Sequence, residues 1–271
     1  MKLDRLMGIL TLWDLTDLAP TQNSSIVYCT SQEHGPCVLK RGSPAEAATA
    51  YHALREYSGT RYCEVYEADI AAGALLLERI VPGTTLRAEP NRDRRLGVFG
   101  DVWRGLHKPP ADKSIYPTYM GWVSRIAEYM RGRRDYELLC TKMAKAEQIC
   151  RSLCAEYPGE MLLHGDLHHY NILLGGEGRW RVIDPKGVVG DPVFDIPRFI
   201  LNEFADGYDE SLPRMLQTLS EKLCIPQGDL MRLTFVETCM AHCWIVESGE
   251  EPNVNQVLLA EKMMDERWLQ P

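Results

Sequence analysis

The chain has 271 residues, of which 45% are hydrophobic and 25% are charged, and its formal net charge is −8. This composition is typical of a globular protein with one large core or two smaller lobes. No stretch approaches the ~20 continuous apolar residues of a membrane-spanning helix. The acidic balance disfavours nucleic acid and anionic membranes as partners and weakly favours a cationic partner.

The N-terminal segment and the cysteines predict a cytoplasmic protein. Asp4 and Arg5 fall where a signal peptide needs its apolar region, so no secretion signal is expected. The nine cysteines are an odd number without framework spacing, as is typical of reduced thiols. Cys239, His242 and Cys243 hint at a metal, but their segment ETCMAHCWIV has the pattern of a buried helical face.

Residues 1–80 are predicted to form strands with one helix inserted among them. SSIVYCTS and PCVLK are short apolar runs on either side of the turn QEHG. The helix follows in SPAEAATAYHALREYSG, where Ser43 is a natural N-cap, Pro44 suits the first helical position and Glu46 stands three residues after the cap. RYCEVYEA and GALLLERIV are two further strands, the second nearly continuous in apolar residues.

After Pro82 and Gly83 the apolar pattern becomes helical. Helices are predicted near 91–107, 118–131 and 135–156, and the chain beyond Pro192 is mostly helical. Between these parts, MLLH, NILL and RWRVID are short strands, and the turn GGEG joins the last two into a hairpin.

This order of elements predicts an α+β fold with two lobes. The first lobe, over residues 1–80, is small and built on an antiparallel sheet with one helix. The second, over 81–271, is larger, mostly helical and contains the hairpin. The two are expected to join near 79–83.

The stretch HGDLHHYNILLGGEGRWRVIDP, which begins at His164, carries the densest set of polar groups. Two chemistries could use it. A zinc site would recruit the histidines together with Asp166, but zinc needs three or four converging ligands, and this interpretation leaves Asn171 and Asp184 without a function. Phosphoryl transfer would use Asp166, Asn171 and Asp184, and we favour it.

The spacing between Asp166 and Asn171 matches a kinase catalytic loop, in which the aspartate meets the substrate hydroxyl and the asparagine holds magnesium. A second magnesium ligand must come from a neighbouring strand end, and Asp184 stands there, after WRVI. Hard oxygen ligands suit magnesium, which also bridges phosphates. The sequence therefore predicts a magnesium site on the hairpin.

Phosphoryl transfer also needs a cation for the nucleotide phosphates. Lys40 ends the strand PCVLK, and a carboxylate on the next helix is expected to orient it. Glu46 is the candidate, with Glu56 as the second choice. The alternative for Glu46 is a capping box with Ser43, which SPAE also fits.

Together these pieces resemble the aminoglycoside phosphotransferase branch of the protein-kinase-like fold, and in particular the streptomycin 6-kinase and hydroxyurea phosphotransferase group. The matching blocks are HGDLHHYNIL, VIDPKGVVGDPVFDIPRF, LLLERIVPGTTL, LKRG and GLHKPP. The resemblance extends from about Ser24 to Trp244. A protein kinase is a poorer match, because this chain has His168 where those enzymes carry lysine and has no DFG at Asp184.

The resemblance implies a role for each polar residue of the site. Asp166 would orient the substrate hydroxyl and accept its proton. Asn171 and Asp184 would hold magnesium on the β- and γ-phosphates of ATP or GTP, and Lys40 would contact the α- and β-phosphates.

The resemblance also implies how the rest of the nucleotide is held. The strand LLLERI would lead to a hinge whose backbone at Glu78, Arg79 and Ile80 hydrogen-bonds the purine. The loop covering the phosphates would be TQNSSIVYC, in which Ser24 and Ser25 replace the usual glycines as donors.

The other polar residues of this region are expected to support the site. His164 would brace the catalytic loop (164–171) through hydrogen bonds, while His169 and His107 would be structural. Asp191 and Asp195 would cap the next helix and tether the loop that carries Asp184.

Two acidic runs are candidates for contact with a cationic acceptor through charge-assisted hydrogen bonds. His168 lies close enough to the predicted base to contact the acceptor or to stabilise the loop. The runs themselves are also compatible with solvated acidic faces. The first contains Glu203, Asp206, Asp209 and Glu210, and the second contains Glu247, Glu250 and Glu251.

The resemblance thus implies a magnesium-dependent kinase that uses ATP or GTP, acts as a monomer or dimer, and phosphorylates a hydroxyl of streptomycin or a related aminoglycoside. The alternatives are a kinase for hydroxyurea or for a cellular sugar or amino alcohol, and a pseudokinase that binds nucleotide without turnover. The intact Asp166, Asn171, Asp184 and Lys40 argue against the pseudokinase.

Overall fold

The computed structural model describes residues 8–21, 23–204 and 207–265, so Asp4, Arg5 and Asp206 lie outside the described residues. The chain divides into two compact units, which are described separately below. The first comprises the chain up to Ala88 together with Tyr170–Gly187, and the second comprises Glu89–His169 and the chain from Val188. This division departs from the expected lobes over 1–80 and 81–271, because the hairpin belongs with the N-terminal unit.

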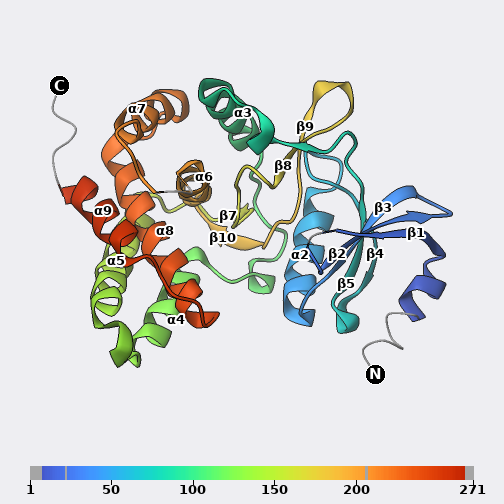
Figure 1. Ribbon diagram of the computed structural model, residues 1–271, viewed down its shortest axis with the longest axis horizontal. Helices are drawn as coiled ribbons and strands as arrows, with labels where there is room; N and C mark the ends of the chain where they lie inside the picture. Colours follow the sequence, from blue (N-terminus) through green and yellow to red (C-terminus); the bar gives the residue numbers. More distant parts are fainter. Residues whose placement is uncertain (1–7, 22, 205–206, 266–271) are drawn as a thin grey trace. The chain divides into compact units, whose positions relative to one another are not determined.

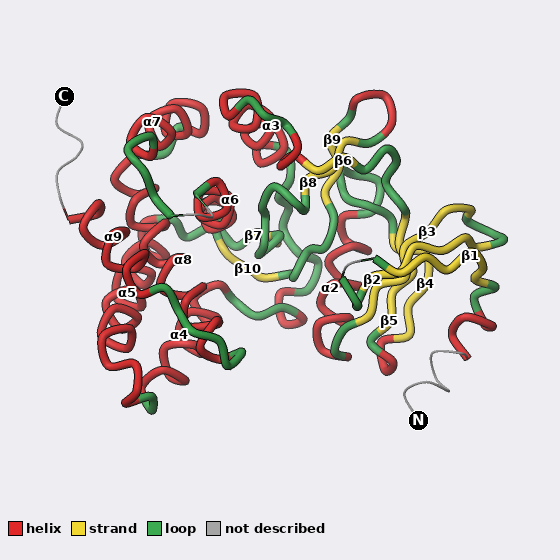
Figure 2. Tube along the Cα trace, viewed as in Figure 1, coloured by secondary structure: helices red, strands yellow, loops and turns green. Residues whose placement is uncertain are grey.

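The first unit contains a five-stranded antiparallel sheet in the order β1-β2-β3-β5-β4. Figure 2 shows these strands running side by side. The four strands expected from the sequence are present, and one strand at the edge of the sheet was not expected. The strands are β1 (Leu15–Pro20), β2 (Ile26–Ser31), β3 (Gly35–Arg41), β4 (Val65–Asp69) and β5 (Ala74–Glu78).

The inserted helix α2 (Pro44–Tyr57) begins as its sequence predicts. Ser43 is the N-cap and forms a capping box with Glu46, and Pro44 is the first helical residue. The buried side of α2 carries alanines, Leu54 and Tyr57, and the helix packs on β4 and β5 (Figure 1). Apolar burial thus holds the helix against these two strands.

The predicted hairpin packs within this first unit. β8 (Ile172–Leu174) pairs with β9 (Trp180–Val182), and the short strand β6 (Thr84–Thr85) pairs with β8 on its other side. Arg181 Nη2 donates to the carbonyl of Tyr62 at 2.7 Å, and the N–H of Cys63 donates to the carbonyl of Val182 at 2.9 Å. These contacts, one from a side chain and one between backbone groups, explain why the hairpin belongs to the first unit.

The second unit is mostly helical. Its helices match the helical segments expected from the apolar periodicity. They are α3 (Arg92–Arg104), α4 (Tyr119–Arg131), α5 (Glu137–Glu156), α6 (Ile196–Glu203), α7 (Leu212–Leu223), α8 (Gln227–Glu247) and α9 (Val254–Asp265).

Helix α8 is the central helix of this unit. It is apolar on nearly all sides, as a helix surrounded by others should be. It packs against α4, α5, α6, α7 and α9 (Figure 1). No helix among the described residues is both long and apolar enough to cross a membrane.

A two-stranded sheet of the second unit leads into the catalytic loop at His164. β7 (Met161–Leu163) pairs antiparallel with β10 (Val188–Gly190), with Leu163 opposite Val188. β7 is buried at Leu162 and Leu163, and the loop begins directly after it. The position of Asp166 therefore depends on a short strand anchored in the core.

Candidate active site

The first unit gathers a lysine pair around one carboxylate. Lys40 of β3 donates a hydrogen bond from Nζ to Oδ1 of Asp184, and Lys186 Nζ donates to Oδ2 at 3.1 Å. Burial alone would raise the pKa of Asp184, but the charges of Lys40 and Lys186 outweigh it and the pKa lies below its ordinary value. Asp184 is therefore ionised at neutral pH, between two cations.

The hairpin explains why Asn171 and Asp184 are neighbours. The N–H of Ile183 donates to the carbonyl of Asn171 at 3.0 Å, which continues the ladder between β8 and β9. Asp184 follows with φ 60°, in the left-handed region that is strained for a residue other than glycine. A carboxylate and an amide oxygen are hard donors of the kind magnesium prefers, so this pair fits the predicted ion.

Glu46 serves the helix terminus and does not orient Lys40. Its carboxylate accepts from the backbone N–H of Ser43 at 3.1 Å and from the Ser43 hydroxyl at 2.9 Å. The hydrogen bonds from Ser43 hold the pKa of Glu46 below its ordinary value. The structure thus favours the capping alternative, and the carboxylate that orients Lys40 is Asp184.

Ser24 and Ser25 lie in the turn between β1 and β2. Asn23 Oδ1 accepts from the N–H of Ser25 at 2.9 Å, and Arg41 Nη2 donates to the carbonyl of Ser24 at 3.2 Å. The N–H of Arg41 donates to the carbonyl of Ser25 at 2.8 Å. The turn is therefore fixed to the residue that follows Lys40, and its contact with nucleotide phosphates remains a prediction.

The strand register places an apolar surface beside Lys40. Leu75 stands opposite Lys40 and Leu77 opposite Val38, and residues two apart on a strand share one face. Val38, Leu75 and Leu77 therefore lie on the Lys40 face of the sheet. The resemblance implies that Leu77 would lie beside the nucleobase, and this contact remains a prediction.

The expected hinge residues follow β5. The carboxylate of Glu78 accepts from Arg181 Nη2 at 2.7 Å, and the Arg79 guanidinium lies 4.1 Å from the ring centre of Tyr28. Ile80 is buried. Purine binding by the backbone of these three residues remains a prediction.

In the second unit, Asp195 holds the backbone of the catalytic loop. Its carboxylate accepts from the N–H of His164 at 2.8 Å and from that of Gly165 at 2.7 Å, and His107 Nε2 lies 2.9 Å from Oδ2. Burial alone would raise the pKa of Asp195, but the hydrogen bond from His107 contributes most to lowering it. Asp195 therefore tethers the loop carrying Asp166, which corrects the expectation that it tethers the loop carrying Asp184.

The histidines of the loop take the supporting roles expected of them. His164 Nδ1 accepts from the N–H of Asp166 at 3.1 Å, which confirms its bracing role. His169 is buried and stacks on Phe199 with 4.1 Å between ring centres. Asp191 caps the following turn by accepting from the N–H of Val193 at 3.1 Å.

Gly165 of the loop has a left-handed backbone and no room for a side chain. Its φ is +79°, and an added Cβ would lie 2.8 Å from the Trp122 ring. We expect Gly165→Ala to lower the free energy of unfolding by about 2–4 kcal/mol, from the left-handed backbone and the forced repacking together. Gly59→Ala is the matched control, because Gly59 has φ +77° and nothing within 4 Å. Equal losses in the two variants, measured by chemical denaturation, would contradict the packing argument.

The carboxylate of Asp166 lies between two basic side chains. Arg198 Nε is 3.3 Å from Oδ1, and His168 Nε2 is 3.6 Å from Oδ2. The Asp166 side chain is 23% exposed, so it remains accessible to an acceptor. Contact of His168 with the acceptor remains a prediction.

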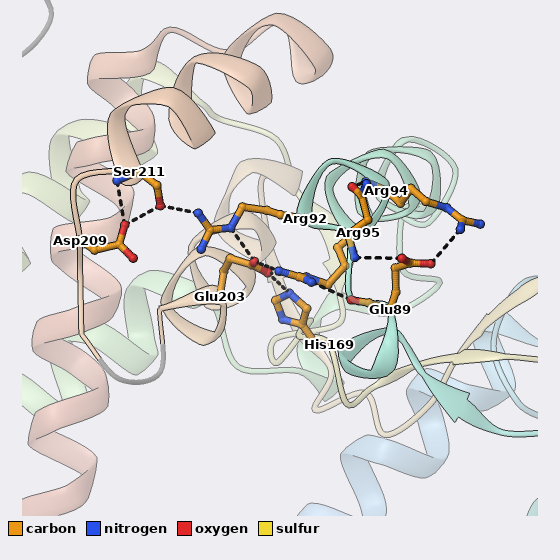
Figure 3. A network of polar contacts seen from close by, with 9 residues as sticks. Glu89, Arg92, Arg94, Arg95, His169, Glu203, Asp209 and Ser211 are labelled. Carbon is orange, nitrogen blue, oxygen red and sulfur yellow. Dashed lines mark hydrogen bonds and ion pairs between the residues drawn. The ribbon is translucent and has the colours of Figure 1, made fainter.

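Glu203 lies at the centre of a network of cations (Figure 3) and is fully buried. It accepts from Arg92 Nε at 2.9 Å and from Arg95 Nε at 3.0 Å, and His169 Nε2 lies 2.6 Å from its Oε2. Burial alone would raise the pKa of Glu203, but hydrogen bonds from His169 and Arg95 lower it to about 2. This carboxylate joins α3, α6 and the catalytic loop, so the structure argues against the predicted contact with an acceptor.

The other predicted acceptor residues are partly engaged elsewhere. Asp209 accepts from the N–H of Ser211 at 2.7 Å. Glu247 forms a two-pronged pair with Arg125, at 2.6 and 2.9 Å, which lowers the pKa of Glu247. Glu250, from the same acidic run, instead lines a groove.

This α6–α8 groove has a cavity volume of about 480 Å³. His242 forms part of its wall and is held by the loop before α9 and by α9 itself. Its Nδ1 accepts from the N–H of Asn253 in that loop at 3.3 Å, and its Nε2 lies 3.1 Å from Oε1 of Gln256 in α9. The groove is lined by Arg198, Leu201, Asn202, Ala241, His242, Trp244, Ile245, Ser248, Glu250 and Gln256.

The hinted metal site at Cys239, His242 and Cys243 is not formed. Both thiols are buried, with pKa values raised by that burial, and His242 pairs with Gln256. Among the residues the structure describes, no three or more His, Cys, Asp or Glu side chains are arranged to hold a metal ion.

Sequence reasoning missed two residues of the site. Lys186 was given no role in the sequence analysis, although it stands two positions after Asp184. A second charged residue so close to a predicted metal ligand at a strand end is a signal that could have identified it. Arg198 lies within the predicted helix IPRFILNEF, and no sequence pattern marks its contact with Asp166.

Comparisons with known proteins agree with this chemistry. Residues 12–249 match the family described as aminoglycoside/hydroxyurea antibiotic resistance kinase. Streptomycin 6-kinase of Streptomyces griseus is 27% identical over 220 residues, which cover 78% of this chain and 71% of the relative. Hydroxyurea phosphotransferase of Kitasatospora aureofaciens is 32% identical over 172 residues, which cover 60% of this chain and 48% of the relative.

Solved structures share the fold. Choline kinase of Streptococcus pneumoniae has a TM-score of 0.66 at 15% identity, and the match covers 97% of this chain and 99% of the choline kinase chain. A thermostable mutant of an aminoglycoside phosphotransferase, solved with ADP and hygromycin B, has a TM-score of 0.66 at 15% identity over 96% of each chain. The predicted α+β, protein-kinase-like fold is confirmed. Because the family model matches nearly the whole chain, this protein belongs to the aminoglycoside/hydroxyurea antibiotic resistance kinase family and is a kinase.

Proposed function

We propose that this kinase transfers the γ-phosphate of ATP or GTP to a hydroxyl of streptomycin or a related aminoglycoside. The observation that carries the proposal is the ionised Asp184 between Lys40 and Lys186, with Asn171 beside it on the hairpin. Such a cluster offers two cations to nucleotide phosphates and oxygen donors to magnesium. The names of the relatives support the acceptor class.

In the proposed reaction, the acceptor oxygen forms a bond to the γ-phosphorus while the bond from that phosphorus to the β–γ bridging oxygen breaks. The hydroxyl proton passes to the carboxylate of Asp166, and ADP or GDP leaves. Lys40 stabilises the charge on the α- and β-phosphates, and positioning supplies most of the rate enhancement. Magnesium, when bound by Asn171 and Asp184, would neutralise charge on the terminal phosphates.

The α6–α8 groove is the proposed seat of the acceptor. Arg198 lines the groove and also contacts Asp166, so a single side chain separates the groove from the predicted base. Trp244 offers an aromatic face, Asn202 and Gln256 offer neutral hydrogen-bonding groups, and Glu250 offers a negative charge. This lining suits a polyhydroxylated molecule with a cationic group.

Charge reversal at Glu250 tests this placement. We expect Glu250→Lys to raise the KM for streptomycin at least about fivefold, because a favourable charge pair worth up to ~1 kcal/mol becomes repulsive. The KM for ATP should not change. Glu210→Lys is the control from the first acidic run, since Glu210 is exposed and does not line the groove. An unchanged KM for streptomycin in Glu250→Lys would remove the groove from the proposal.

One observation supports hydroxyurea as a second candidate acceptor. The hydroxyurea phosphotransferase relative has a higher identity, 32%, than the streptomycin kinase of Streptomyces griseus, 27%, although over a shorter stretch. Hydroxyurea is small and uncharged, so its phosphorylation would not respond to charge at Glu250.

The deciding experiment measures ADP release from ATP and magnesium with streptomycin, hydroxyurea, or a panel of sugars and amino alcohols, followed by mass spectrometry of the acceptor. The proposal expects streptomycin or another aminoglycoside to gain one phosphoryl group. Gain by hydroxyurea alone would select the second acceptor. Nucleotide binding without transfer to any acceptor would instead indicate a pseudokinase.

A further inference from the structure

The proposed reaction gives Arg198 no role, yet its side chain contacts the proposed base. It lies in the first turn of α6, three residues after the N-cap Asp195. The start of α6 therefore reaches the catalytic loop twice, since Asp195 accepts from the N–H groups of His164 and Gly165 and Arg198 Nε lies 3.3 Å from Asp166 Oδ1. The start of one helix thus hydrogen-bonds the backbone of the loop and contacts its carboxylate.

The other end of the guanidinium is anchored in the core. Arg198 Nη2 lies 2.7 Å from Glu237 Oε1, and Glu237 Oε2 accepts from the Tyr119 hydroxyl at 3.1 Å. The ring centre of Trp244 is 5.4 Å from the guanidinium carbon. The Glu237 side chain is only 3% exposed, so withdrawing Arg198 would leave a buried carboxylate unpaired. The arginine is therefore held in place.

The charges agree with this geometry. Burial alone would lower the pKa of Arg198, but the carboxylates of Glu237 and Asp166 raise it above its ordinary value. Burial raises the pKa of Glu237, and Arg198 opposes that effect most. Arg198 is thus a fixed cation between two carboxylates.

The two oxygens of Asp166 have different surroundings. Oδ1 faces Arg198, whose Nε–H has no aligned hydrogen-bond partner among the described residues, while Oδ2 lies 3.6 Å from His168 Nε2. A buried donor of this kind favours an orientation of the carboxylate that satisfies it. The planar guanidinium can reach Asp166 and Glu237 through separate N–H groups, which a lysine cannot do in the same geometry.

We propose that Arg198, backed by Glu237, is a positioning residue for phosphoryl transfer. It holds Oδ1 of Asp166 so that Oδ2 is the oxygen that receives the proton of the acceptor hydroxyl. This inference rests on the proposed function, in which Asp166 is the base. A carboxylate displaced by as little as 1 Å loses up to ~10²-fold in rate, so the contact has consequences for turnover.

The test uses the charge-neutral pair Arg198→Met/Glu237→Gln, which leaves no buried charge without its partner. Release of ADP is followed with ATP, magnesium and streptomycin, and with water as the only acceptor. We expect kcat to fall about 10–10²-fold while the KM for ATP stays within about twofold. Arg198→Lys should keep the charge and the fold but lose about tenfold in kcat, because it cannot hold both carboxylates.

Two comparisons separate positioning from a structural role. In an Asp166→Asn background the pair variant should cause no further loss of kcat, because Arg198 acts through the missing carboxylate. Lys142→Met/Glu261→Gln removes a half-buried pair between α5 and α9 and should leave kcat unchanged. Wild-type kcat in the Arg198/Glu237 variant, or additive losses with Asp166→Asn, overturns the inference. Full activity of Asp166→Asn alone instead overturns the proposed base.

Discussion

Replacing Asp166 with alanine is expected to lower kcat by ~10²–10⁴-fold, the usual contribution of a positioned general base. The carboxylate is partly exposed, while the loop that carries it is held by His164 and Asp195. Nucleotide binding should therefore persist, because the substitution leaves the loop backbone and the first unit unchanged. The measurement is kcat by ADP release, together with ATP affinity by fluorescence or calorimetry.

The control for this prediction is Asp101→Ala. Asp101 belongs to the same unit, and its side chain is 71% exposed and pairs with Arg104 on one helix. Loss of an exposed pair of this kind costs at most about 1 kcal/mol and should leave kcat unchanged. Unimpaired turnover of Asp166→Ala would reject the role assigned to Asp166.

Asp184→Asn is expected to abolish the dependence of nucleotide affinity on magnesium and to lower kcat at least ~10²-fold. The substitution keeps the size of the side chain but removes the charge that would hold the ion. Lys40 and Lys186 lose their shared carboxylate at the same time. ATP without magnesium should therefore bind about two- to fivefold more tightly, since the freed lysines attract its phosphates.

The readout is a pair of ATP titrations, with magnesium and with a chelator, for the wild type, Asp184→Asn and Asp166→Asn. Asp166→Asn is the internal control, because it should retain the magnesium dependence. If Asp184→Asn still bound ATP more tightly with magnesium than without, Asp184 would not be a ligand of the ion.

The same carboxylate predicts a pH dependence of stability. The pKa of Asp184 is lowered in the folded chain, so its contribution to stability is present at neutral pH. That contribution is lost as the pH falls through the folded pKa, below the ordinary aspartate value of about 3.9. In Asp184→Asn, the free energy of unfolding should therefore fall less than in the wild type as the pH is lowered through this range.

Local patterns predicted most of the fold correctly. The start of α2 is marked by four consecutive residues that include Ser43, Pro44 and Glu46. The structure shows the capping box between Ser43 and Glu46. The helices near 118–131 and 135–156 follow from apolar periodicity and correspond to α4 and α5. Asp184 was placed after a strand by its position in RWRVID, and it lies after β9.

Contacts between distant segments explain what was missed. Lys40 takes Asp184 as its partner and not Glu46, because Glu46 is already engaged at the N-terminus of its own helix. Glu203 looked like part of an acidic surface, but arginines from α3 enclose it. Periodicity within one helix does not indicate which side chain of another helix will face it.

Arg198 illustrates the same limit within the catalytic machinery. The segment IPRFILNEF predicts a helix, and α6 forms there. The partner that fixes the arginine, Glu237, lies in α8 within a segment that is otherwise apolar. A buried glutamate in such a helix indicates a buried cation, but only the packing of α6 on α8 identifies which one.

The most direct test of the proposed site is a crystal structure with magnesium and a non-hydrolysable ATP analogue. We expect a metal ion about 2.1 Å from oxygens of Asn171 and Asp184, with Lys40 Nζ released from Asp184 onto the α- or β-phosphate. A nucleotide bound with its metal away from Asn171 and Asp184, or with Lys40 still paired to Asp184 and far from any phosphate, would contradict it.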